Sequence, residues 1–274
     1  MKNNTITLPC FPYPGGKTKM REYVLSLIPA HKTYVEPFAG GLAVLLGKPR
    51  SKCEVVNDID DDLVMFFRYV RLHGDALLAE IDAVLAARRE FEFFRNRKPD
   101  TELGKALAFF FRQMVSFGGI GESFSRRRDK APHWGSDMIK QRILAVRERL
   151  RRVYIECKPA NEIIRFYDTP ETFFFVDPPY VCANPARYEA FSQEQMAELR
   201  DVLDKCTGMW LLTCDDSERC REIFSGFRTT QVANLYSLAN TAPKSVSELV
   251  VFSKNFPVQN ETRFPVSGRQ VKAA

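Results

Sequence analysis

An aspartate and a tyrosine flank two prolines in Asp177-Pro178-Pro179-Tyr180, directly after the apolar run Phe173-Phe174-Phe175-Val176. Four apolar residues rich in aromatic rings predict a fully buried strand. The prolines end that strand, because neither can donate to a sheet ladder and each fixes its own φ. We therefore expect a carboxylate and an aromatic ring on a stiff turn past the carboxyl end of a central strand. Open α/β sheets bind their ligands at such a place.

A second carboxylate, Asp58, is predicted to end another strand, which begins at Cys53. It lies 18 residues after Gly40, in the small-residue loop Phe38-Ala39-Gly40-Gly41. Glycines there let the backbone approach a ligand, and the apolar helix predicted over 42–46 presents free N–H groups. An acidic residue about 20 residues after such a loop is placed to accept hydrogen bonds from ribose hydroxyls. The loop lacks the G-x-G-x-x-G pattern, which disfavours a nicotinamide or flavin cofactor.

An alternation of strands and helices must position these carboxylates. Strands are predicted at 34–37, 53–58, 153–157, 172–176, 209–213, 229–235 and 248–253, and helices at 20–28, 42–46, 161–166, 192–203 and 216–224. About eighty residues of helical, basic sequence interrupt the alternation, with a break at Pro99. The pattern predicts an α/β, Rossmann-like domain formed by residues 1–74 and 153–256. A smaller, mainly helical domain is inserted at 75–152, and 257–274 form a polar tail.

The basic charge is concentrated in one segment of the chain. Residues 88–152 contain 17 Lys and Arg against 8 Asp and Glu, a net charge of +9, whereas the whole chain carries +6. Such a concentration indicates an electrostatic footprint for nucleic acid, although solvated helix faces alone would explain part of it. Glycines, arginines and a tryptophan predict an exposed loop or hairpin between 116 and 135. Its candidate contacts to phosphates or base edges are Arg126, Arg127, Arg128, Lys130 and Trp134.

Composition limits the remaining classes of protein. The seven cysteines form no C-x-x-C pair and the three histidines form no ligand pattern, so we expect reduced thiols and no metal site. We find no apolar run of membrane-spanning length and no signal segment, and therefore expect a cytoplasmic protein that does not contact membranes.

Taken in order, four motifs resemble those of the Dam-like (D12) class of DNA N6-adenine methyltransferases, over nearly the whole chain from Pro12 to about Phe256. Pro14-Gly15-Gly16-Lys17 resembles the amino-terminal G-G-K motif of that family, and residues 35–41 resemble its cofactor loop. Asn57-Asp58-Ile59-Asp60 is similar to its ribose-binding acidic motif, and Asp177-Pro178-Pro179-Tyr180 to its catalytic motif. The basic segment takes the place of the target-recognition domain.

This resemblance implies methyl transfer from S-adenosylmethionine to N6 of an adenine flipped out of double-stranded DNA. Asp177 and a carbonyl of the Pro178-Pro179 turn would accept the two N6–H groups, which makes the nitrogen lone pair available. Tyr180 would stack on the extruded base. Tyr188 or Phe191 would form the other wall of the base pocket.

The resemblance also implies the cofactor-binding residues. They are Tyr13, Lys17, Glu36, Pro37, Phe38, Gly40, Asp58, Cys157 and Asp177. Lys158 and Pro159 depart from the polar contact that the family places near the cofactor adenine, so that contact is unassigned. The recognition segment departs from the GATC-specific pattern, which leaves the target sequence open. A bacterial or phage-encoded protein, monomeric in solution, is expected, and a partner restriction endonuclease is compatible with it.

Three alternatives stay open at this point. A cytosine-N4 methyltransferase would use the same chemistry, although serine often replaces the aspartate at the position of Asp177. A DNA-binding protein that keeps the fold without catalysis would not need Asp58, Gly40 and Asp177 intact. A protein-glutamine methylase would explain the Pro-Pro-Tyr turn but not the basic insertion.

Overall fold

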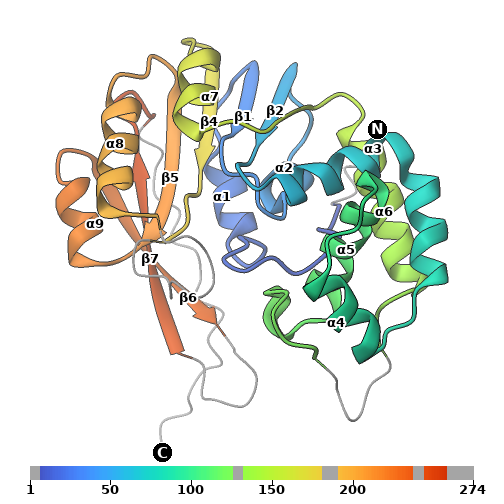
Figure 1. Ribbon diagram of the computed structural model, residues 1–274. Helices are drawn as coiled ribbons and strands as arrows, with labels where there is room; N and C mark the ends of the chain where they lie inside the picture. Colours follow the sequence, from blue (N-terminus) through green and yellow to red (C-terminus); the bar gives the residue numbers. More distant parts are fainter. Residues whose placement is uncertain (1–6, 126–131, 181–190, 237–243, 258–274) are drawn as a thin grey trace, which may run out of the picture.

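A twisted sheet with helices on both faces forms the larger half of the molecule (Figure 1). The computed structural model describes residues 7–125, 132–180, 191–236 and 244–257. Within these ranges the strands are ordered β3-β2-β1-β4-β5-β7-β6. Their bounds are β1 Thr33–Glu36, β2 Cys53–Asn57, β3 Tyr154–Glu156, β4 Thr172–Val176, β5 Met209–Asp215, β6 Arg228–Tyr236 and β7 Lys244–Phe252. The first five strands pair in parallel, whereas β7 is antiparallel to both β5 and β6. The predicted Rossmann-like sheet is confirmed.

Strand β4 lies at the centre of this sheet, between β1 and β5, and all five of its residues are buried. Successive side chains of a strand point to opposite faces. Phe173 and Phe175 accordingly belong to one hydrophobic cluster, and Phe174 and Val176 to the other. Because both faces are covered, the strand is a continuous apolar run without alternation.

Helices α7 (Ala160–Tyr167), α8 (Gln193–Asp204) and α9 (Glu218–Ile223) cover the face that carries Phe174 and Val176. Helices α1 (Arg21–Leu27) and α2 (Ala43–Gly47) lie on the opposite face (Figure 1). Local signals explain the start of α8, where Ser192 and Gln195 form the predicted reciprocal cap. The Gln195 amide donates to Ser192 Oγ at 3.2 Å, and the Ser192 amide donates to Gln195 Oε1 at 2.7 Å.

The interrupting segment is helical, as expected. It contains α3 (Asp61–Ala83), α4 (Arg88–Asn96), α5 (Glu102–Val115), the short 3-10 helix η1 (Phe117–Gly119) and α6 (Asp137–Leu150). Helix α3 runs through the predicted boundary at residue 75, with non-helical dihedrals at His73. Phe66, Phe109 and Phe110 share one cluster with Phe173 of the sheet, so the core is continuous from β4 into the helices. The division into domains therefore stays a prediction.

A buried ion-pair network joins the last helix of this segment to the sheet. The Arg149 guanidinium, on α6, donates to both carboxylate oxygens of Glu54 on β2, at 2.5 and 2.8 Å. Lys48 Nζ donates to the same Glu54 at 2.7 Å. Breaking a buried pair by removing one partner typically costs about 3–5 kcal/mol. The network thus ties α6 to β2, the strand that Asp58 directly follows.

Candidate active site

The carboxyl ends of the parallel strands meet at one edge of the sheet, where the chain order reverses between β1 and β4. This is the topological switch point at which open α/β sheets form their ligand-binding crevice. Asp177 directly follows β4, Asp58 directly follows β2, and the Phe38–Gly41 loop follows β1. The fold therefore brings three motifs, distant in sequence, to the same edge.

The Asp177 carboxylate is held by two donors at the same oxygen. Lys17 Nζ lies 2.5 Å from Asp177 Oδ1, and Thr213 Oγ1 donates to that oxygen at 2.7 Å. Burial raises the pKa of Asp177, and the Lys17 ammonium partly opposes the shift. The carboxylate thus sits in a confined polar site, with its rotation fixed by Thr213.

Lys17 joins the Gly-Gly-Lys turn to the Asp-Pro-Pro-Tyr turn. Its Nζ donates to the Tyr180 hydroxyl at 3.1 Å and to the Gly15 carbonyl at 3.3 Å. It lies 5.0 Å from the centroid of the Tyr180 ring and 3.7 Å from Glu248 Oε2. Only 2% of the Lys17 side chain is exposed. The sequence indicated both turns as site elements, but not that a buried ammonium would connect them.

Asp58 orders the loop after β1. The Gly40 amide donates to Asp58 Oδ2 at 2.9 Å, and the Asp60 amide donates to Oδ1 at 3.1 Å. Burial raises the pKa of Asp58, and these amide bonds partly oppose the shift. A carboxylate has about four acceptor sites, so Asp58 keeps capacity for ligand hydroxyls. Asp60 itself caps α3, through bonds from the amides of Asp62 and Leu63.

The loop backbone is strained and lies against an aromatic ring. Gly40 has φ of 45°, and Leu42 has φ of 60°, a left-handed conformation that is costly for leucine. A Cβ atom added to Gly40 would lie 3.1 Å from two ring carbons of Tyr13. Tyr13 therefore packs directly on the predicted cofactor loop.

Glu36 does not reach the surface of this site. It is 2% exposed and accepts a hydrogen bond from the Tyr34 hydroxyl at 2.7 Å. Burial raises the pKa of Glu36 to about 7. The reason for its orientation is the pleat: successive residues of β1 point to opposite faces, and Glu36 shares the face of Tyr34. The expectation that Glu36 contacts a ligand is thus not supported by its geometry.

Asn57 connects the loops after β1 and β3, a contact that was not predicted. Its Nδ2 donates to the carbonyls of Pro37 and Lys158, each at 2.9 Å, and its Oδ1 accepts from the Lys158 amide. Pro37 thus enters the site through its backbone. Cys157 is exposed, and its Sγ lies 4.0 Å from the carbonyl oxygen of Ile59.

Trp134 is buried, which corrects the expectation that it stands on an exposed loop. It is 8% exposed, its Nε1 donates to the Val84 carbonyl at 2.8 Å, and its ring centroid lies 4.7 Å from that of Phe111. The indole contributes a large apolar surface to the helical core and satisfies its one donor there. Four other predicted DNA contacts lie outside the described residues: Arg126, Arg127, Arg128 and Lys130.

Of the two predicted base-pocket residues, Tyr188 also lies outside the described residues. Phe191 contacts the loop after β1: its ring centroid lies 5.8 Å from that of Phe38, with the rings perpendicular. Two further residues at the site were missed, Thr213 and Glu248. Thr213 lies near the carboxyl end of β5, beside β4, a position that the strand-end rule could have indicated.

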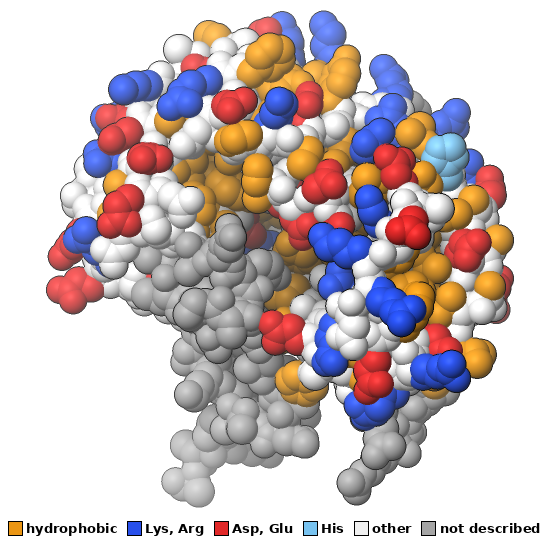
Figure 2. Space-filling view, viewed as in Figure 1, with side chains coloured by type: hydrophobic (Ala, Val, Ile, Leu, Met, Phe, Trp, Pro, Cys, Tyr) orange, Lys and Arg blue, Asp and Glu red, His pale blue; other side chains and the backbone are white. Residues whose placement is uncertain are grey.

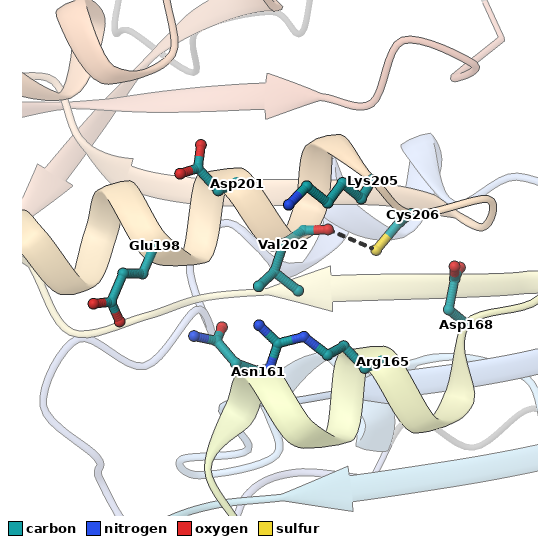
Figure 3. A pocket seen from close by; sticks show the side chains of 8 residues that line it. All are labelled: Asn161, Arg165, Asp168, Glu198, Asp201, Val202, Lys205 and Cys206. Carbon is teal, nitrogen blue, oxygen red and sulfur yellow. Dashed lines mark hydrogen bonds between the residues drawn. The ribbon is translucent and has the colours of Figure 1, made fainter.

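Away from the strand-end site, the described residues form a separate groove, but they hold no cluster suited to a metal ion and no membrane-spanning helix. A groove of about 430 Å³ between α7 and α8 (Figure 3) is lined by charges of both signs, among them Arg165, Lys205, Glu198 and Asp201. It shares no lining residue with the strand-end site. Among the described residues, no His, Cys, Asp and Glu side chains cluster in a way that could hold a metal ion. No described helix combines the length and apolarity needed to span a membrane.

Comparison with known proteins gives a consistent result. The family model described as D12 class N6 adenine-specific DNA methyltransferase matches residues 13–238. The type II methyltransferase M.MjaIII of Methanocaldococcus jannaschii is 27% identical over 199 residues, covering 63% of this chain and 68% of that protein. M.CviBI of Paramecium bursaria Chlorella virus NC1A is also a type II methyltransferase, 23% identical over 83% of this chain and 90% of its own. A DNA adenine methylase of Vibrio cholerae is 23% identical, covering 78% and 83%.

Among solved structures, an rRNA methylase from Streptococcus thermophilus aligns with a TM-score of 0.36 and 9% sequence identity. The alignment covers 86% of this chain and 94% of that chain. At this TM-score the structural similarity carries no argument, and the fold assignment rests on the strand order and pairing of the sheet.

Proposed function

The chain belongs to the D12 class N6 adenine-specific DNA methyltransferases, and from this premise we propose that it transfers the methyl group to an adenine held at Asp177. The observation that supports this most directly is the position of Asp177. It is a confined carboxylate at the switch point, on a turn that cannot join the sheet ladder, and it shares the Lys17 ammonium with the Tyr180 hydroxyl.

The chemistry requires positioning more than covalent catalysis. The lone pair of an exocyclic adenine nitrogen is delocalised into the ring, so this nitrogen is a poor nucleophile. Asp177 accepts one N6–H, and a backbone carbonyl of the Pro178-Pro179 turn accepts the other, which draws the nitrogen towards tetrahedral geometry. S-adenosylmethionine, the methyl donor implied by the family, supplies an electrophilic sulfonium methyl when bound. A preorganised acceptor in a confined site stabilises the charge that develops on N6.

The residues at the strand ends fit such a cofactor. Asp58 retains acceptor capacity for ribose hydroxyls, and it holds the Gly40 amide in the loop on which Tyr13 packs. Ile59, which sequence reasoning did not select, is 69% exposed next to Asp58 and offers an apolar surface for a purine ring. Pro37, Phe38 and Cys157 would line the site. Glu36 instead accepts a hydrogen bond from Tyr34 on the same strand.

We further propose how DNA is engaged. The target adenine is extruded from the duplex, at a cost of a few kcal/mol, and stacks on Tyr180, with Phe191 beside Phe38 at the rim of the pocket. The helical segment forms the recognition surface. Figure 2 shows Lys and Arg side chains over this half, interspersed with acidic ones. The protein acts as a monomer on a specific sequence, in the cytoplasm, with or without a partner endonuclease.

The test is incubation of the purified protein with labelled S-adenosylmethionine and unmethylated double-stranded DNA, followed by nucleoside analysis and single-molecule mapping. We expect N6-methyladenine at one short motif. N4-methylcytosine, or no label in DNA despite measured cofactor binding, would contradict the proposal.

A further inference from the structure

Two carboxylates, one half-buried and one fully buried, share the ammonium group of Lys17. Its Nζ lies 2.5 Å from Asp177 Oδ1 and 3.7 Å from Glu248 Oε2. The side chain of Glu248 is fully buried. Glu248 is on β7, and in the antiparallel register of the sheet it lies opposite Asp215, the last residue of β5. An antiparallel strand thereby brings an acidic residue to the edge where the parallel strands end.

The Lys17 ammonium occupies the position that the proposed function gives to the target base. It donates to Asp177 and to the Tyr180 hydroxyl, and it lies 5.0 Å from the centroid of the Tyr180 ring. A base whose N6–H bonds to Asp177 Oδ1, the oxygen that already accepts from Lys17 and Thr213, must displace the ammonium to stack on this ring. An ammonium left between them would also repel a positively charged methyl donor.

We propose, resting on the function proposed above, that Glu248 is a positioning residue that takes over the Lys17 ammonium when the target base reaches Asp177. The required movement is short, since an ordinary N–H to carboxylate contact is about 2.8 Å, roughly 1 Å less than the present separation from Glu248. Lys17 remains paired throughout. If Lys17 moved to solvent instead, Glu248 would lose a charge partner inside the protein, which is strongly unfavourable.

Thr213 keeps Asp177 in place during this exchange. Its hydroxyl donates to Asp177 Oδ1 at 2.7 Å and is itself fully buried. When Lys17 moves to Glu248, the carboxylate therefore keeps its orientation and gains free acceptor capacity for N6–H. The exchange converts an ion pair that blocks the pocket into a pocket ready for the base.

Replacing Glu248 by glutamine removes the charge and preserves the shape. In Glu248→Gln, Lys17 should stay on Asp177. We expect single-turnover methyl transfer to fall at least about 30-fold, as expected for losing one partner of a buried charge pair. The fluorescence of 2-aminopurine at the mapped target position should also fall, because extruded base is not retained. Binding of S-adenosylmethionine, measured by calorimetry, should stay within about twofold.

A double-mutant cycle with Lys17→Gln separates this role from support of the fold. Without the ammonium there is nothing to transfer, so Glu248→Gln should change 2-aminopurine fluorescence little in the Lys17→Gln background. Equal losses in both backgrounds would overturn the proposal. Glu218→Gln, at an exposed position on α9, is the control and should behave like the wild type.

The outcomes also separate this inference from the proposed function. If the wild type methylates no DNA adenine, the proposed function fails and the inference fails with it. If the wild type is active but the cycle shows no coupling, only the role of Glu248 is rejected. Should Glu248→Gln not fold, Glu248→Asp is the second variant. It keeps the negative charge but places it farther from Lys17, because the side chain is shorter by one methylene. Methyl transfer at the wild-type rate by Glu248→Asp would overturn the proposal.

Discussion

At the scale of single residues, the two carboxylates at the strand ends differ in their partners, and this difference predicts different defects. Asp177 bonds to side chains, Lys17 and Thr213. Asp58 bonds to backbone amides of the loop that it orders, at Gly40 and Asp60. Substitutions at Asp58 should therefore weaken cofactor binding more than they slow the methyl-transfer step.

We predict that Asp58→Asn weakens binding of S-adenosylmethionine by about 10- to 100-fold, the range expected for losing hydrogen bonds to a charged group. The amide keeps one acceptor oxygen, which retains one of the two bonds that Asp58 accepts from the amides of Gly40 and Asp60. Calorimetric titration measures the effect, with Asp61→Asn, an exposed neighbour on α3, as the control. Equal affinities for the wild type and Asp58→Asn would refute a ribose-binding role.

Glu36 gives a prediction about stability and pH. Its pKa is raised from 4.5 to about 7 by burial, so the folded state holds a proton that the unfolded state releases. The stabilisation is complete below pH 4.5 and is lost as the pH rises through about 7. Over that window the difference reaches roughly 3 kcal/mol, at about 1.4 kcal/mol for each pH unit.

The measurement is urea unfolding across this pH range for the wild type, Glu36→Gln and the exposed control Glu80→Gln. Glu36→Gln should flatten the decline in the free energy of unfolding, because the amide does not titrate. Glu80→Gln should follow the wild type. Parallel curves for all three proteins would show that Glu36 titrates normally.

At the scale of elements, the turn η1 is where the helical segment meets the turn that carries Lys17. Gly119 has φ of +69°, and a Cβ atom there would lie 2.4 Å from the Pro12 carbonyl oxygen. Gly135 has a similar φ of +72°, with nothing within 4 Å of its added Cβ. Comparing alanine substitutions at the two positions therefore distinguishes the cost of backbone strain from the cost of a steric clash.

We predict that Gly135→Ala costs about 1–2 kcal/mol, the penalty of a left-handed alanine. Gly119→Ala should cost clearly more and should also slow methyl transfer, because the clash displaces the Pro12 turn. Chemical denaturation and single-turnover transfer measure both. Identical effects of the two substitutions would mean that η1 does not support the site.

Local signals explain which elements could be predicted from the sequence. The apolar run ended by Pro178 predicted β4, and the serine and glutamine before 196 predicted the cap of α8. Contacts between distant segments could not be predicted. No local pattern pairs Glu248 with Lys17, since an antiparallel strand far along the chain brings them together. Trp134 looked exposed because its helical neighbours are distant in sequence.

At the scale of the whole molecule, the basic charge of residues 88–152 and the strand-end site have to act on the same DNA. The net charge of +9 in that segment contrasts with −3 in the rest of the chain. Nucleic-acid binding of this kind releases counterions and weakens with salt. The helices share a continuous core with the sheet, which fixes the α3–α6 bundle against the sheet.

We predict that replacing Arg126, Arg127 and Arg128 together by glutamine lowers the slope of log affinity against log salt by up to about 2.7, or about 0.9 for each phosphate that is no longer neutralised. Titrations of a short duplex at several salt concentrations measure the slope. The matched control replaces three exposed basic residues outside the 88–152 segment, Lys205, Arg219 and Arg221, by glutamine. An unchanged slope would place the phosphate-binding residues elsewhere.

The most direct test of the role of Asp177 compares single-turnover methyl transfer to unmethylated duplex DNA by the wild type and by Asp177→Asn, with cofactor and DNA affinities measured in parallel. We expect N6-methyladenine from the wild type. In Asp177→Asn, transfer should fall by about 100-fold or more, while both affinities stay within a few fold. A variant that methylates adenine at the wild-type rate would contradict the assignment of Asp177 as the acceptor for the reacting nitrogen.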